Sequence, residues 1–218
     1  MRLVLDVENT VTKRDDKVHL DPFEPSNHLV QVGMLDADDP KPTLTIKTLD
    51  HNEATDFTGF QRLEVQWNLD NTDLLIMHNA QHDLMWLWQC GFKYDGDIYD
   101  TMLGEYILDR GQRNPLSLQA CAERRQLEVQ KDDTLKKYFK EGKNTNEIPL
   151  AELCHYLEHD LLTTCELFHA QEKDFALPES ASLSTIKRVT FQTCKTLTEI
   201  YSAGFKVDLQ ELERVAKE

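Results

Sequence analysis

The order of the strand-like segments constrains the fold of this chain most strongly. Three of them come first, at residues 3–7, 29–35 and 43–49, and the last two are separated by the turn-rich DADDPKP. Two more, at residues 74–79 and near Ile98, alternate with helical patterns. Because neighbouring strands followed by strand–helix alternation are typical of α/β architectures, we predict a sheet covered by helices.

The composition favours a packed but acidic protein. Of the 218 residues, 40% are hydrophobic and 29% are charged, which is enough for a packed core and excludes wholesale disorder. The net charge of −15 argues against strong non-specific binding of nucleic acid, because phosphates attract Lys and Arg. It is compatible with a metal-loaded nuclease, since bound cations offset acidic side chains. No apolar run approaches the length of a membrane span, so we expect no membrane partner.

The cysteines indicate a reducing compartment and argue against a zinc site. The five cysteines form no C-x-x-C pair and are odd in number, which suits a cytoplasmic protein. A group of possible zinc ligands lies close together in the sequence, namely Cys154, His155, His159 and Cys165. Their spacing matches no standard zinc pattern, so we predict a cytoplasmic protein without zinc.

Acidic residues follow two of the predicted strands. Asp6 and Glu8 stand two residues apart at the end of the first strand, so both point to one face at the edge where open α/β sheets bind ligands. Asn79 and Asp83 follow the fourth strand and share a helical face if a helix begins near Ala80. The alternatives are acids that are merely solvated at a strand end, and an Asn79 side chain that caps the helix.

A third acid borders the buried face of a long predicted helix. The apolar residues between positions 149 and 173 form one helical stripe. Asp160 lies about 60° and Tyr156 about 100° from the centre of the stripe, on the same flank. His155 and His159 lie about 160° away, so we expect them to face water. A carboxylate at the edge of a core needs a partner, which either a metal ion or a salt bridge would provide.

These residue types suit the hydrolysis of a phosphodiester bond. Carboxylates gathered from three segments repel one another unless cations lie between them. Ligand sets made only of oxygen favour Mg²⁺ or Mn²⁺, and two such ions stabilise the attacking and leaving oxygens of a phosphodiester displacement. A tyrosine hydroxyl can orient the attacking water, but it is a poor base because its usual pKa is about 10.

Three ordered motifs resemble those of a known nuclease family. The chain carries, in this order, D-x-E (Asp6, Glu8), HN-x-x-x-D (Asn79, Asp83) and Y-x-x-x-D (Tyr156, Asp160). They look like the three exonuclease motifs of the DEDD superfamily, and their order and spacing resemble the tyrosine-type 3′–5′ proofreading domain of phage-type family A DNA polymerases. The segments YDTMLGEYIL, PLSLQACAERR and GKNTNEIPLAEL resemble parts of that domain, and AGFKVDLQELERV resembles the stretch where the polymerase portion begins.

The resemblance implies a fold, a reaction and residue roles. The fold would be ribonuclease H-like, with a mixed five-stranded central sheet flanked by helices. The activity would be removal of nucleotides from the 3′ ends of single-stranded DNA by two-metal hydrolysis. Two divalent cations, Mg²⁺ or Mn²⁺, would bind to the acids of the motifs, which are Asp6, Glu8, Asp83 and Asp160. Tyr156 would position the attacking water, and Asn79 would support the site or the terminal nucleotide.

The same resemblance divides the chain and implies its partners. Residues 1–180 would form the exonuclease domain, and residues 181–218 a helical segment leading into a polymerase domain outside this chain. The partners would be a single-stranded DNA 3′ end and that polymerase domain, in the cytoplasm of an infected bacterium if a phage encodes the protein. Two alternatives remain open: a free-standing 3′–5′ exoribonuclease, and a non-catalytic docking module that keeps the fold.

Three further features each have a structural and a functional interpretation. Asp100 matches a family aspartate that opens a helix, and we favour a structural role for it. The lysine cluster KKYFKEGK at residues 136–143 could contact phosphates, but a solvated helix face is the favoured interpretation. Trp86 and Trp88 cannot share a helical face, so we expect at least one in the core, which leaves the other able to stack on a base.

Overall fold

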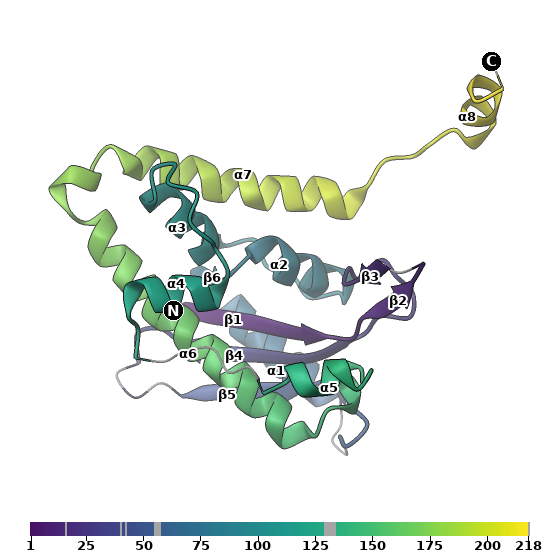
Figure 1. Cartoon of the computed structure of the whole chain (residues 1–218), viewed down its shortest axis with the longest axis horizontal. Helices are drawn as coiled ribbons and strands as arrows, with labels where there is room; N and C mark the ends of the chain where they lie inside the picture. The colour runs from purple at the N-terminus through teal and green to yellow at the C-terminus, as the bar shows by residue number, and fades with distance from the viewer. Residues whose placement is uncertain (16, 40, 42, 55–57, 129–133, 218) are drawn as a thin grey trace.

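A central sheet of five strands organises the computed structural model of the chain (Figure 1). The structure describes every residue except 16, 40, 42, 55–57, 129–133 and 218. The strands of the sheet are β1 (Arg2–Asn9), β4 (Leu29–Asp36), β5 (Leu44–Thr48), β6 (Leu74–Met77) and β7 (Asp97–Asp100). They lie in the order β5-β4-β1-β6-β7, with β1, β6 and β7 parallel and β4 antiparallel to both of its neighbours. This confirms the predicted α/β fold with a mixed five-stranded sheet.

The pairing of β1 leaves one of its edges open near its carboxyl end. β1 pairs with β4 from Leu3 to Asn9, but it pairs with β6 only from Arg2 to Val4. The backbone beyond Val4 therefore has no strand partner on the β6 side. This open edge lies where the parallel strands end, which is where α/β sheets bind ligands.

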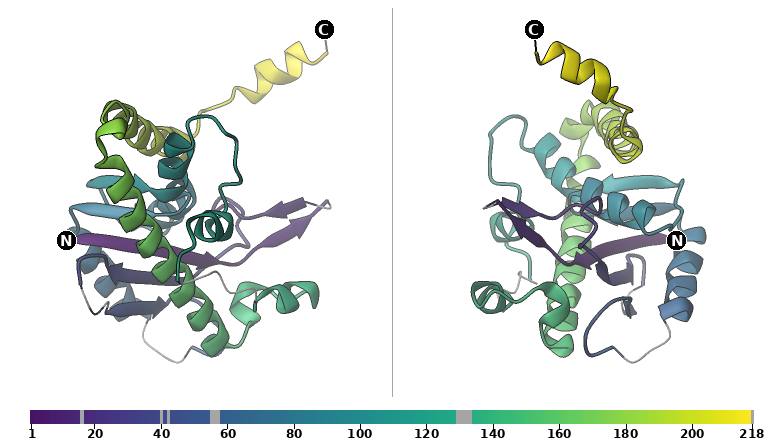
Figure 2. Two further views of the ribbon diagram at one scale, coloured as in Figure 1. Left: turned by 60° about the vertical axis from the view of Figure 1, so that its left-hand side comes forward. Right: turned by 90° about the vertical axis from the view of Figure 1, so that its right-hand side faces the viewer.

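Helices cover both faces of the sheet (Figure 2). The α-helices are α1 (Thr58–Asp70), α2 (Ala80–Gln89), α3 (Thr101–Leu108), α4 (Leu118–Arg125), α5 (Lys136–Lys140), α6 (Leu150–Phe175), α7 (Leu183–Ala203) and α8 (Leu209–Val215), and the 3₁₀ turns are η1 (Thr145–Glu147) and η2 (Pro178–Ser180). α6 crosses one face against β1 and β4, with α3 and α4 beside it, whereas α1 and α2 lie on the other face. α7 packs on α2, α3 and β7.

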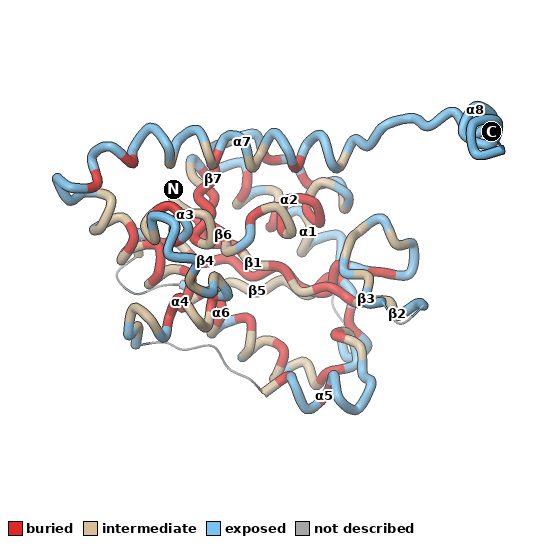
Figure 3. Tube along the Cα trace, turned by 45° about the horizontal axis from the view of Figure 1, so that its top comes forward, coloured by how far each residue is buried: buried red, intermediate tan, exposed pale blue. Residues whose placement is uncertain are grey.

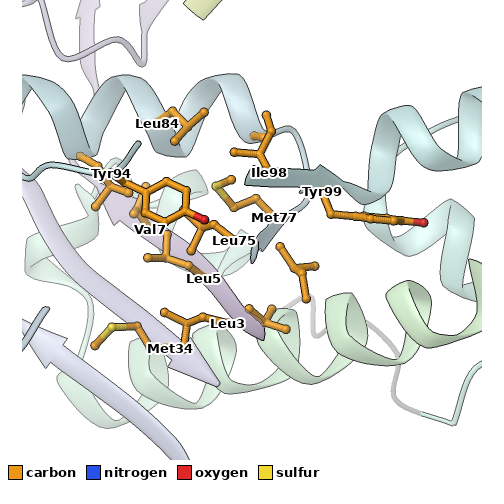
Figure 4. Close-up of a cluster of buried hydrophobic side chains, with 14 of the residues drawn as sticks. Leu3, Leu5, Val7, Met34, Leu75, Met77, Leu84, Tyr94, Ile98 and Tyr99 are labelled. Carbon is orange, nitrogen blue, oxygen red and sulfur yellow. The ribbon is translucent and has the colours of Figure 1, made fainter. Parts of the chain in front are cut away.

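The main hydrophobic core lies against the central strands and fixes β1 in place. Figure 3 shows buried residues running along β1 and β4. Figure 4 shows one part of the core, where β1, β6 and α2 contribute the buried side chains Leu3, Leu5, Val7, Leu75, Met77 and Leu84. Because alternate residues of a strand face opposite sides, the core on this face leaves Asp6 and Glu8 pointing to the α6 face.

The two C-terminal helices differ in how they are packed. α7 contributes Leu183 and Phe191 to the main core, so the packed body extends beyond residue 180. α8 has no buried residue and lies away from the body (Figure 1). The division of the chain at residue 180 stays a prediction. Within the described part of the chain, none of the helices has both the length and the apolar character needed to cross a membrane.

The structure differs from the sequence-based expectation in two places. A separate two-stranded sheet, formed by β2 (Thr12–Arg14) and β3 (Lys17–His19), follows β1 and was not predicted. Its strands, TKR and KVH, are short and mostly polar, so no apolar alternation reveals them. The long helix predicted over residues 149–173 is α6, which begins one residue later and ends two residues later.

Candidate active site

The carboxyl half of β1 presents the first acidic pair toward α6. Asp6 and Glu8 are half-buried, and Val7 between them is buried in the core on the opposite face. The shift of register between β1 and β4 falls just after Glu8, so the strand bends as it leaves the sheet. The pair is therefore held by a rigid strand at the point where the sheet opens.

Gly33 lets α6 approach the acids on β1. It is the register partner of Asp6 on β4. A Cβ atom at this position would lie 2.6 Å from Leu161 Cδ1 and 2.9 Å from Leu157 Cγ, both on α6. Such contacts are shorter than carbon atoms tolerate, so a larger residue would push the helix away. The sequence analysis did not identify Gly33, although an isolated glycine inside a strand is a signal of close approach.

α6 then places its two motif residues toward β1. Asp160 is only 5% exposed, and Tyr156 is half-buried against a small cluster of core residues. His155 is exposed, as predicted for the face of α6 that points to solvent, and its Nδ1 lies 3.9 Å from Glu158 Oε2. His159 is half-buried rather than fully exposed, because its ring packs edge-on against the His155 ring.

The electrostatic environment of Tyr156 shows that it lies among the acids. Burial raises the pKa of its hydroxyl, and the negative charges of Asp160, Glu8 and Asp6 raise this pKa further. A deprotonated phenol would add another negative charge to this group, so the tyrosine stays in its neutral form. The structure thus brings together residues of the first and third motifs.

The second motif joins the group through Asp83 on α2. This side chain is 1% exposed, and its Oδ1 accepts a hydrogen bond of 3.2 Å from the Val7 N–H on the open edge of β1. Burial raises the pKa of Asp83 well above its usual value, as do the charges of Asp6 and Asp100, while the bond from Val7 lowers it. Two neighbouring carboxyl groups with no cation between them repel each other when both are charged, and this repulsion contributes to the raised pKa.

Asp100, and not Asn79, provides the side chain that caps α2. Asn79 is exposed, stands at the start of α2 with φ of 71°, and its side chain forms no capping hydrogen bond. The capping alternative for Asn79 is therefore wrong. The buried Asp100 side chain instead accepts hydrogen bonds from the N–H groups at the starts of α2 and α3, which belong to Asn79, Ala80, Met102 and Leu103. This confirms the predicted structural role of Asp100.

The donor chemistry of the site fits divalent cations. Its four acids offer only oxygen ligands, which Mg²⁺ and Mn²⁺ prefer. Burial raises the pKa of Asp83 most, and the charge of Asp6 raises this pKa further; a cation would offset the contribution of Asp6. Within the described residues, no group of three or more His, Cys, Asp and Glu side chains is already close enough together to hold a metal ion.

Several side chains that were not among the predicted site residues form hydrogen bonds that hold the segments around the site together. His82 Nε2 lies 2.9 Å from Asn9 Oδ1, which links α2 to the end of β1, and burial lowers the pKa of His82. Asn144 accepts a hydrogen bond of 2.8 Å from the Val11 N–H and donates one of 2.9 Å to the Val11 carbonyl. Asn144 also forms a capping box with Glu147, and the N-x-x-E pattern is a sequence signal for such a turn.

Comparison with solved structures shows the fold. The chain is similar to the apo form of a nuclease, with a TM-score of 0.65 and 15% identity over 93% of this chain and 85% of that chain. It is also similar to Brucella melitensis NrnC with bound Mg²⁺, with a TM-score of 0.61 and 17% identity over 93% of this chain and 86% of that chain. No protein-family model and no curated protein matches the sequence. The chain therefore has the ribonuclease H-like fold predicted from its motifs.

Proposed function

We propose that this protein is a metal-dependent 3′–5′ exonuclease that removes nucleotides from the 3′ ends of single-stranded DNA. The observation that carries this proposal is the convergence of three separate elements, which bring Asp6, Glu8, Asp83, Asp160 and Tyr156 to one edge of the sheet. Carboxylates that lie close together repel one another and destabilise the fold, so their convergence supports a site that binds cations. The similarity in fold to a nuclease, and to NrnC, which is described with bound Mg²⁺, supports the same reaction class.

The residues of the chain would share the work of binding and orienting the reactants. Two Mg²⁺ or Mn²⁺ ions, held by the four acids, would supply a water of lowered pKa and stabilise the charge on the phosphodiester. Tyr156 stays protonated because its pKa is raised, so its hydroxyl would orient the attacking water rather than deprotonate it. Asn79, exposed at the start of α2, would contact the terminal nucleotide.

The proposed reaction cleaves one bond at a time from the 3′ end. Water attacks the phosphorus of the last phosphodiester and its proton passes to solvent. The bond between phosphorus and the 3′ oxygen of the preceding nucleotide breaks, and that oxygen takes up a proton. The products are a nucleoside 5′-monophosphate and a strand shortened by one nucleotide.

We place this activity in the proofreading part of a phage-type family A DNA polymerase, because the motifs and the segments between them resemble that domain. A free-standing 3′–5′ exoribonuclease is the second candidate. The similarity in fold to a structure described as a nuclease supports it as much as it supports the first candidate. The two candidates share a site and differ in whether the substrate carries a 2′-hydroxyl group.

Hydrolysis of matched DNA and RNA oligonucleotides tests the proposal. The protein is mixed with 5′-labelled single strands of the same sequence in Mg²⁺, and the products are separated by length. We expect a ladder that shortens from the 3′ end of DNA, and a rate roughly 10³-fold lower for Asp6→Asn, since that change removes one preorganised charge from the site. Preferential shortening of RNA would select the second candidate.

The matched control for Asp6→Asn is Asp36→Asn, on the strand β4 that pairs with β1 but outside the site. It should leave the rate unchanged. Absence of hydrolysis of both substrates in Mg²⁺ and in Mn²⁺ would reject the enzyme and leave the non-catalytic docking module. A residual rate that Asp6→Asn does not change would show that the activity comes from elsewhere.

A further inference from the structure

A hollow opens between the β2–β3 hairpin and the segment that runs from α5 to Asn144. Its volume is about 460 Å³, and its lining includes Val11, Val18, Leu20, Phe139, Lys13 and Lys143. Figures 1 and 2 place the hairpin and α5 at the same end of the molecule, with α5 beside the start of α6. We call this feature the hairpin hollow. It combines the unpredicted hairpin with the lysine cluster that the sequence analysis singled out.

The walls of the hairpin hollow expose large apolar side chains to solvent. Val18 is 55% exposed, Leu20 50% and Phe139 40%. Isolated exposed apolar residues are common, but apolar residues that line one concavity indicate a binding surface. An exposed aromatic ring beside aliphatic side chains is a surface on which the flat face of a base can stack.

The segments that form the hairpin hollow are rich in Lys and Arg. Residues 11–20 and 135–144 together contain seven Lys and Arg but three Asp and Glu, in a chain with 24 of the former and 39 of the latter. Lys13 and Lys143 belong to the lining itself, and Lys143 Nζ lies 4.8 Å from the centre of the Tyr138 ring. Positive charge is therefore concentrated at this end of an otherwise acidic protein, where it favours a ligand with repeated negative charges.

The hairpin hollow is linked to the candidate active site through the chain that follows β1. Val11, in its lining, is three residues after Glu8, which corresponds to roughly 10 Å of extended chain. The two hydrogen bonds between Asn144 and Val11 fix the α5 side of the hollow to this stretch of chain. A strand whose 3′ end lies at the acids would reach the hollow within about three stacked nucleotides.

We propose that the hairpin hollow binds the single-stranded nucleic acid upstream of the terminal nucleotide, with bases stacked on Phe139 and phosphates held by Lys13 and Lys143. This inference rests on the proposed exonuclease function, because that function supplies the strand and its direction. The hollow offers the positive charge that the acidic site lacks. It therefore accounts for how a protein of net charge −15 holds a polyanion.

Binding without turnover tests the inference separately from catalysis. Fluorescence anisotropy is measured in EDTA with a labelled single strand of about ten nucleotides. We expect Phe139→Ala to weaken binding by about tenfold through the loss of one stacked base. We expect Lys13→Ala and Lys143→Ala each to lower the slope of log K against log salt by about 0.7. Lys206→Ala, an exposed lysine beyond α7, is the matched control and should change neither quantity.

The comparison of long and short substrates supplies the second measurement. In Mg²⁺, the three variants should lower the ratio of kcat/KM for the long strand to that for a dinucleotide, which does not reach the hollow. Unchanged affinity, salt slope and ratio in all three variants would overturn the inference even if wild-type protein hydrolyses DNA. Weakened binding in the variants would support it even if no hydrolysis occurs, in which case the proposed function fails by itself.

Discussion

Two buried acids, Glu105 on α3 and Asp83 on α2, show two different solutions to the same problem. Glu105 is 3% exposed, and its carboxylate lies 3.0 Å from Arg124 and 2.7 Å from Arg125. Gln171 of α6 donates a further hydrogen bond of 2.9 Å to Glu105. Asp83 is 1% exposed, but the charges that act on it most strongly are those of other carboxylates.

The difference separates a structural acid from a functional one. A buried carboxylate needs compensation, and the chain provides it for Glu105 from its own arginines. At Asp83 the chain adds one hydrogen bond from the Val7 N–H and further acids, Asp6 among them, so an external cation would be a favourable partner. A cation is the simplest external partner for such a group. The comparison therefore supports a metal site without any use of the resemblance to nucleases.

Removal of the charge of Glu105 should have the largest effect on stability. Glu105→Gln keeps the shape of the side chain but leaves two arginines without their buried partner. We expect the free energy of unfolding to fall by about 3 kcal/mol, measured by urea denaturation. The matched change Asp83→Asn should not lower the stability of the metal-free protein, because it removes a charge that repels Asp6. Equal losses of unfolding free energy in the two variants would contradict the distinction between a structural and a functional acid.

Addition of Mg²⁺ at a concentration 100-fold above Kd should raise the free energy of unfolding by about 2.7 kcal/mol in variants that keep the site. For a chain of 218 residues this corresponds to a rise in Tm of about 5–10 °C. We expect this rise for wild type and for Glu105→Gln, measured from their own metal-free Tm values, and a much smaller rise for Asp83→Asn. Thermal unfolding in EDTA and in Mg²⁺ measures all three. A rise in Asp83→Asn equal to that of wild type would place the ion elsewhere.

The sequence predicted what depends on local pattern, and it missed what depends on packing. Alternation and apolar runs located all five strands of the sheet, and the helical stripe of α6 gave the outward direction of His155. The close approach of α6 to Gly33 and the arginine pair at Glu105 join segments far apart in the chain, so no local spacing reveals them. Asn79 was taken as a possible cap because Asn is common there, but Asp100, brought near by β7, takes that role.

The packing at Gly33 tests whether the position of α6 determines the response to Mg²⁺. Gly33→Ala places a Cβ against Leu157 and Leu161, which should cost about 2 kcal/mol of stability and displace the part of α6 that carries Asp160. Activity should fall with it, and the Mg²⁺-dependent rise in Tm should shrink, since both depend on that acid. The matched control is Gly59→Ala in α1, where nothing lies within 4 Å of the added atom. A fall in stability with an unchanged response to Mg²⁺ would show that Asp160 is not a ligand.

The smallest predicted effect separates two neighbours on α6. Tyr156 lies among the acids and His155 faces solvent, although they are adjacent in the sequence. We expect Tyr156→Phe to lower kcat about tenfold, because it removes the hydroxyl that would hydrogen-bond to the attacking water. His155→Ala should change kcat by less than about twofold, since its contact with Glu158 is an exposed pair of the kind that contributes little.

The measurement is the single-turnover rate on single-stranded DNA, which isolates the chemical step from product release. Circular dichroism of both variants confirms that α6 is intact. A loss of activity in His155→Ala with Tyr156→Phe unaffected would mean that the functional face of α6 is the one that the structure turns to solvent. In that case the histidine would orient the water, and the raised pKa of Tyr156 would reflect its burial among acids without a role in the reaction.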